Sequence, residues 1–131
     1  MIRKIDYKGV LLACLALVII YLIVKNNDNN KKRLIKNHPL VITSIIQKTE
    51  SAGYRGSYLK LYVEFLWQGK MVKKDFSSPE TKCAVIGREL LLIVDSTNIE
   101  NVKLLLKPED FSEFNLTFPD SLSWTKECFK L

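Results

Sequence analysis

The feature that most constrains this chain is an unbroken apolar run, Val10–Val24, of fifteen residues without a charge, a proline or a glycine. As an α-helix the run is about 22 Å long at roughly 1.5 Å per residue, whereas the hydrocarbon core of a bilayer is about 30 Å thick. Lys8 and Lys25 can extend their ammonium groups outward from its ends, and Tyr7 suits the interfacial region. A small domain could not enclose a run that is apolar on every face. We therefore predict one transmembrane helix over about residues 9–25.

Two other interpretations of the run fit less well. A cleaved signal peptide agrees with the basic start, but residues 25–28 (KNND) follow the run and offer no small-residue cleavage site. Residues 11–14 (LLAC) resemble a lipobox, yet ten further apolar residues follow Cys14. We therefore expect the segment to stay on the mature chain as an uncleaved anchor in the cell membrane.

The basic residues beside the run leave its orientation open. Three precede it and five follow it: Arg3, Lys4 and Lys8, then Lys25, Lys31, Lys32, Arg33 and Lys36. The positive-inside rule counts these residues and leans towards a cytoplasmic C-terminal domain. Export of a short tail with three fixed positive charges is itself unfavourable, however, and the two considerations nearly cancel.

A polar, basic segment, residues 26–37 (NNDNNKKRLIKN), separates the anchor from the rest of the chain. It has too few apolar residues to form a core, so we expect a tether or a helical extension. Its basic side chains are candidates for contact with anionic lipid, worth about 1 kcal/mol per charge near the surface; they are Lys31, Lys32, Arg33 and Lys36. The alternative is an ordinary flank that only orients the helix.

The net charge of +6 lies entirely in the N-terminal part of the chain. Residues 1–36 carry 8 basic and 2 acidic side chains, and residues 37–131 carry 12 of each. A domain that binds nucleic acid normally has a basic face of its own. The charge distribution therefore predicts a membrane partner and no nucleic-acid partner.

Alternating apolar residues predict a β domain over residues 38–131, after an N-terminal segment (1–25) and a linker (26–37). The expected strands are residues 40–49, 58–68, 71–76, 90–94 and 102–107. In the second strand Leu59, Leu61, Val63, Phe65 and Trp67 share one face. The Gln68-Gly69-Lys70 turn predicts a hairpin to the third strand, and the continuously apolar fourth strand predicts burial on both faces.

Short connections between five strands favour a bent antiparallel sheet or a partly open barrel, of the size of OB and SH3 folds. Pro108 suits the first turn of a short helix. The apolar residues beyond it are spaced irregularly and are expected to form a lid across the sheet; they are Phe111, Phe114, Leu116, Phe118 and Trp124. The fold class is therefore mainly β with one N-terminal transmembrane helix.

Residues able to carry chemistry are sparse. One His and three Cys are too few for a zinc cluster or a disulfide scaffold. No nucleophile motif flanks His38, and Cys14 lies in the apolar run. Cys83 and Cys128 are expected to be free thiols, with one disulfide as the alternative. The acidic residues 109, 110, 113 and 120 lack the spacing of a calcium loop. We thus predict no catalytic residue, no metal site and no cofactor.

Aromatic and basic side chains near the second strand form a candidate contact face for a protein partner, because Tyr and Arg are enriched in interfaces. They are Tyr54, Arg55, Tyr58, Lys60 and Tyr62. The alternative is an ordinary outward-facing strand surface, where aromatic residues are also common.

The order of anchor, basic linker, long strand ending in Gly69-Lys70, and Gly87 before an apolar strand resembles a group of small single-pass bacterial membrane proteins. The resemblance spans residues 5–107. In that group the segment after the apolar strand reads Asp-Pro-x-Asn-Pro, and here Ser96 and Ile99 replace the prolines. The resemblance implies the anchor and the β fold and transfers no catalytic residue.

These features together predict a non-enzymatic, single-pass membrane protein that presents a small β domain for protein–protein interaction. An immunity or accessory factor of an envelope or secretion system is one concrete form of this function. One alternative is a sensor or tether on anionic lipid that uses the basic linker. A second is an enzyme of unrecognised type, which would depend on scattered Asp, Glu or Lys residues.

Overall fold

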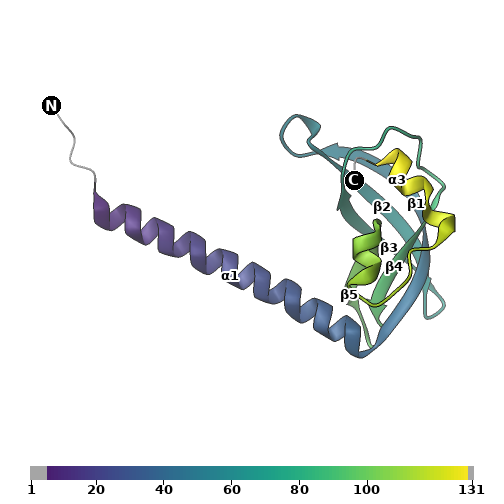
Figure 1. Cartoon of the computed structure of the whole chain (residues 1–131), viewed down its shortest axis with the longest axis horizontal. Helices are drawn as coiled ribbons and strands as arrows, with labels where there is room; N and C mark the ends of the chain where they lie inside the picture. The colour runs from purple at the N-terminus through teal and green to yellow at the C-terminus, as the bar shows by residue number, and fades with distance from the viewer. Residues whose placement is uncertain (1–5, 130–131) are drawn as a thin grey trace.

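The computed structural model describes residues 6–129 and consists of a long helix joined to a curled β-sheet (Figure 1). Helix α1, Tyr7–Asn37, begins where the Asp6 carboxylate accepts hydrogen bonds from the backbone N–H groups of Lys8 and Gly9. Its 31 residues span about 46 Å at roughly 1.5 Å per residue. The helix is long and apolar enough to cross a membrane. Arg3 and Lys4 of the N-terminal basic flank lie outside the described residues.

The segment expected to be a tether or a helical extension forms the last turns of α1. Ile35 is fully buried there, and it packs in one cluster with Ile93, Leu105 and Phe111 of the domain. Helix and domain therefore share an apolar core at their junction.

The sheet has five antiparallel strands in the spatial order β3-β2-β1-β4-β5. The strands are β1 (Pro39–Ala52), β2 (Tyr58–Trp67), β3 (Lys70–Ser78), β4 (Glu89–Asp95) and β5 (Asn98–Leu105). The first half of β1 pairs with β4 and its second half pairs with β2, with a register shift between Ile46 and Lys48. Such a shift bends a strand, and the sheet curls into a half-barrel. The predicted mainly β fold with a bent sheet is confirmed.

The β2–β3 hairpin forms at the predicted turn. Gln68 and Gly69 both have positive φ angles, 48° and 77°. A two-residue loop of this kind matches the right-handed twist of the strands that it joins. Strand β2 keeps a regular ladder with β3. Its predicted apolar face lies inside the curl, where Leu61, Val63 and Phe65 are buried.

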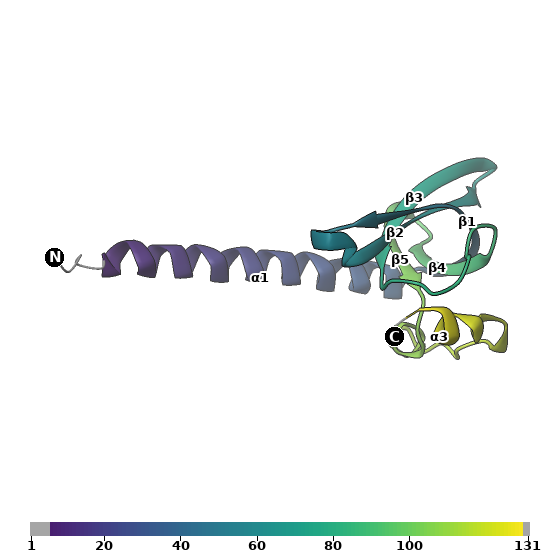
Figure 2. The same ribbon diagram turned by 90° about the horizontal axis from the view of Figure 1, so that it is seen from above.

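Strand β4 is buried on both faces, as its unbroken apolar sequence predicts. Leu92 and Val94 belong to the cluster inside the curl, whereas Ile93 belongs to the cluster on the outside. The C-terminal part of the chain covers that outer side with α2 (Pro108–Ser112), η2 (Asp120–Leu122) and α3 (Trp124–Cys128). Figure 2 shows α3 as a separate layer beside the strands. The predicted lid is therefore present.

The expectation that Cys83 and Cys128 are free thiols is wrong, because the two residues form a disulfide bond. The chain after β3 runs beside the C-terminal segment. The backbone N–H of Lys82 donates to the Cys128 carbonyl over 2.7 Å, and Thr81 pairs with Phe129 in an antiparallel bridge. These contacts are non-local, so the spacing of the cysteines in the sequence could not reveal them.

Candidate functional site

The candidate site is the seam, which we define as the space between the two edge strands, β3 and β5. The curl of the sheet brings these edges to face each other, and Lys74 of β3 forms an ion pair with Glu100 of β5 over 3.3 Å. Among the described residues, each edge strand has only one ladder partner, β2 for β3 and β4 for β5. The barrel is therefore open along one line.

Two adjoining cavities form a groove along this line, which we call the seam groove. The larger, of about 500 Å³, is lined by residues from both edge strands together with α1 and α2. The smaller, of about 250 Å³, shares Ser77, Leu104 and Asp110 with the first and extends to Pro79. Phe76 and Leu104 border the groove and also pack against the core inside the curl. The groove therefore combines an apolar floor with a polar rim.

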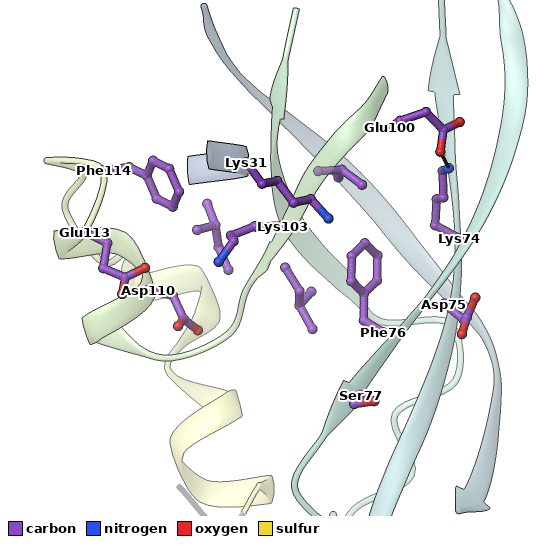
Figure 3. Close-up of a pocket in the computed structure, with 13 residues that line it drawn as sticks. Lys31, Lys74, Asp75, Phe76, Ser77, Glu100, Lys103, Asp110, Glu113 and Phe114 are labelled. Carbon is purple, nitrogen blue, oxygen red and sulfur yellow. Dashed lines mark hydrogen bonds and ion pairs between the residues drawn. The ribbon is translucent and has the colours of Figure 1, made fainter. Parts of the chain in front are cut away.

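Three lysines border the larger cavity of the groove: Lys31 of α1, Lys74 of β3 and Lys103 of β5 (Figure 3). Lys103 forms a salt bridge with Asp28 over 2.8 Å, and Lys74 is held by Glu100. Lys31 makes no hydrogen bond or ion pair with any described residue, and its side chain points into the groove. Partial burial, and then the nearby Lys103 charge, lower the pKa of Lys31.

The docking of α1 on the domain places Lys31 at the groove. Lys32, on the next position, forms ion pairs with Glu113 at 3.2 Å and with Asp28 at 3.6 Å. The hydrogen bond to Glu113 raises the pKa of Lys32. Together with the buried Ile35, these contacts hold the last turns of α1 against the sheet and α2.

The basic residues proposed as lipid contacts therefore divide into two groups. Lys31, Lys32 and Lys36 are directed to the domain; the Lys36 ammonium lies 6.0 Å from the centre of the Phe114 ring. Arg33 is exposed. The structure thus gives two of the four residues, Lys32 and Lys36, contacts within the protein.

The predicted aromatic contact face also divides. Tyr58, Lys60 and Tyr62 lie together on the outward face of β2, as strand alternation requires. Lys60 pairs with Asp75 over 3.6 Å. The Tyr62 hydroxyl donates to Glu50 over 3.1 Å, and this hydrogen bond raises the Tyr62 pKa.

Tyr54 and Arg55 belong instead to η1 (Tyr54–Gly56), in the loop between β1 and β2. The Tyr54 side chain is 79% exposed, and the Arg55 guanidinium stacks 5.1 Å from its ring centre. This loop projects from the domain in the direction of the N-terminal end of α1 (Figures 1 and 2). Neither residue lines the seam groove.

The remaining chemistry-bearing residues have structural contacts. The Asp110 carboxylate accepts hydrogen bonds from the backbone N–H groups of Leu106 and Lys107, which caps α2. His38 is exposed at the C-terminal end of α1. Within residues 6–129, no group of three or more His, Cys, Asp or Glu side chains could hold a metal ion.

No family model, no curated protein and no solved structure matches this chain. The resemblance to single-pass bacterial membrane proteins therefore stays a prediction.

The seam groove is the feature that sequence reasoning missed. An odd number of antiparallel strands was its available signal, because such a sheet cannot close on itself with every neighbour antiparallel.

Proposed function

We propose that this protein is a non-enzymatic, single-pass membrane protein whose β domain binds another protein. The observation that carries the proposal is the seam groove, where two strand edges stay unpaired within the described residues. Unpaired strand edges are templates for pairing with another chain. The groove is also bordered by apolar side chains, which supports a protein as its partner.

The junction between α1 and the domain supports a partner at the membrane surface. Lys31 follows Lys25, at the end of the apolar run, by six residues, which is about 9 Å along a helix at roughly 1.5 Å per residue. The contacts of Ile35 and Lys32 attach these turns to the domain. A groove held this close to the anchor suits a partner in, or bound to, the same membrane.

The disulfide supports a location of the β domain on the oxidising side of the membrane, because disulfides persist in such compartments and are rare in the cytosol. Arg3, Lys4 and Lys8 would then remain cytoplasmic, in agreement with the cost of exporting a basic tail. The counts of basic residues, five after the run and three before it, differ too little to outweigh the disulfide. A bacterial immunity or accessory factor of an envelope or secretion system is consistent with this placement.

The alternative, a tether or sensor on anionic lipid, has less support. Lys32 is paired with Glu113 and Asp28, so its charge is already engaged. Lys31 points into the groove. The positions of Lys31 and Lys32 therefore favour the binding of a protein in the groove over the binding of a lipid surface.

Site-specific photocrosslinking in native membranes tests the proposal. A benzophenone amino acid at Ser77, which is exposed and borders the groove, should crosslink one protein species. The matched control is Lys73, which is exposed on the same strand and does not line the groove. Lipid adducts alone, or identical protein adducts from both positions, would contradict the proposed function.

A further inference from the structure

We propose that the seam groove binds an extended segment of the partner protein, which adds a sixth strand antiparallel to both β3 and β5. The inference rests on the proposed function and specifies how the partner is bound. Three independent properties of the groove support it: the direction of its two edges, the backbone groups along them, and the side chains at its floor and rim.

The direction of the strands favours a single inserted strand. In a sheet of five strands in which every neighbour is antiparallel, the first and last strands run in the same direction. Here these strands are β3 and β5, which face each other across the seam. One strand that runs opposite to both would make every neighbouring pair antiparallel, and the barrel would close with six strands.

The lining of the groove shows that strand edges border it. Four consecutive residues of β3, 74–77, and four of β5, 102–105, line the larger cavity. Since successive side chains of a strand point to opposite faces, a cavity that lay over one face would be lined by alternate residues. Backbone N–H and C=O groups along both edges are thus available to an inserted strand.

Individual donors on the β3 edge follow from the hairpin register. The two-residue turn joins Trp67 and Lys70 as the first pair of the ladder. Hydrogen-bonded and non-bonded pairs alternate from there, so the odd-numbered residues of β3 direct their N–H groups away from β2. Asp75 and Ser77 thereby present donors to the groove, and Lys73 presents one beyond it.

The side chains indicate the chemistry of the inserted segment. On the inner side it would meet Phe76, Val102 and Leu104, which suit apolar residues. On the outer side it would meet the Lys31 ammonium, which has no ion pair with a described residue, and Lys103. Four carboxylates line the same cavity, and each already has a partner: Asp75, Glu100 and Glu113 pair with lysines, and Asp110 accepts from backbone N–H groups. The segment that fits is therefore an extended peptide that alternates apolar and acidic residues.

Fluorescence anisotropy with the full-length protein in neutral detergent tests this inference. The probe is a labelled nine-residue peptide that alternates valine and glutamate. Control peptides replace every glutamate by lysine, or carry N-methyl groups that remove alternate backbone donors. We expect the acidic peptide to bind and both controls to bind at least about tenfold more weakly, as expected for lost charge-assisted and backbone hydrogen bonds.

Two matched pairs of variants locate the binding. Lys31→Gln should weaken the acidic peptide about tenfold, whereas Arg33→Gln removes one charge from the same helix turn and should leave binding unchanged. Ser77→Pro removes a donor that faces the groove, and Lys73→Pro removes one outside it; Pro is tolerated at such edge positions. We expect only Ser77→Pro to weaken binding.

Equal affinity for the acidic and basic peptides, or equal effects of the two proline variants, would overturn the sixth-strand inference. The proposed function would stand in that case if Ser77 still crosslinks a protein in membranes and Lys73 does not. Absence of a protein crosslink from Ser77 would instead reject the proposed function itself.

Discussion

Removal of the disulfide should destabilise the domain substantially. The perturbation is the double substitution Cys83→Ala and Cys128→Ala. In the chain-entropy model, a bridge that closes a loop of 45 residues stabilises the folded state by about 4 kcal/mol. Domains of this size are stable by only about 5–15 kcal/mol. We therefore expect a much lower urea midpoint for the double variant.

Tryptophan fluorescence of the full-length protein in neutral detergent provides the assay, since Trp124 lies 6.0 Å from the Phe129 ring, directly beside Cys128. Wild type with a reductant should unfold at the midpoint of the double variant. Cys14→Ala is the matched control, because Cys14 is a free, exposed cysteine on α1. The stabilising role of the disulfide would be refuted if the wild-type urea midpoint were the same with and without reductant, or if the Cys14→Ala variant were as unstable as the double variant.

Three further predictions concern the junction and the sheet. Ile35→Ala should lower the free energy of unfolding by about 2–5 kcal/mol, as for other fully buried aliphatic residues, and should speed proteolysis between α1 and β1. An unfolding curve that does not change would contradict the shared core of helix and domain. Trp67→Ala should lower the free energy of unfolding by about 3 kcal/mol, because Trp67 packs against the inner cluster. Tyr62→Ala should lower it by less than about 1 kcal/mol, because the hydrogen bond of its hydroxyl group is exposed. Equal losses of stability in thermal melting would show that the two faces of β2 are misassigned. The hydrogen bond from Lys103 lowers the pKa of Asp28 below its ordinary value of 3.8. The ionised Asp28 carboxylate should therefore contribute its full stabilisation above pH 3.8, and this stabilisation should be lost as the pH falls through the lowered pKa. Asp28→Asn should therefore remove that contribution at neutral pH and flatten the acid limb of a pH titration of stability.

The local signals in the sequence predicted four strands to within three residues at each end, whereas β5 begins at Asn98, four residues before its expected start. Alternation in residues 58–68 placed Leu61, Val63 and Phe65 on the buried face, because side chains of a strand must alternate. The unbroken apolar run of β4 indicated burial on both faces, and Pro108 marked the start of α2. Each of these features depends on residues close together in the chain.

The helical junction was harder to predict from composition. Residues 26–37 are mostly polar, and Leu34 and Ile35 were the only apolar signal. Helix formation is limited by its nucleus; the apolar run already forms one, so each added residue costs comparatively little. The burial of Ile35 against Ile93 and Leu105 then stabilises the extension. That contact brings together residues more than fifty positions apart, which periodicity does not report.

The disulfide and the seam groove could not be predicted from local sequence patterns, because both bring together residues that are far apart in the chain. Cys83 meets Cys128 only because the lid returns beside the segment after β3. Lys31 reaches the groove only because α1 docks beside β5. The aromatic candidates are close in sequence but belong to different elements, since Tyr54 lies in the η1 loop and Tyr62 on strand β2.

The charges of the seam bear on which strands could pair with its open edges under the proposed function. The unpaired backbone groups of an open sheet edge can pair with any exposed strand. Charged side chains along the edge oppose such pairing, because an incoming apolar strand would remove these charges from water without supplying an opposite charge. Lys74 and Glu100 neutralise each other across the seam, and Asp28 neutralises Lys103. Of the three lysines at the larger cavity, Lys31 is therefore the one whose charge has no ion pair with a described residue. An apolar strand would bury that charge at a cost, whereas a strand with a carboxylate at the matching position would satisfy it. In the proposed complex, the side chain that deters unspecific pairing would therefore also select the partner strand.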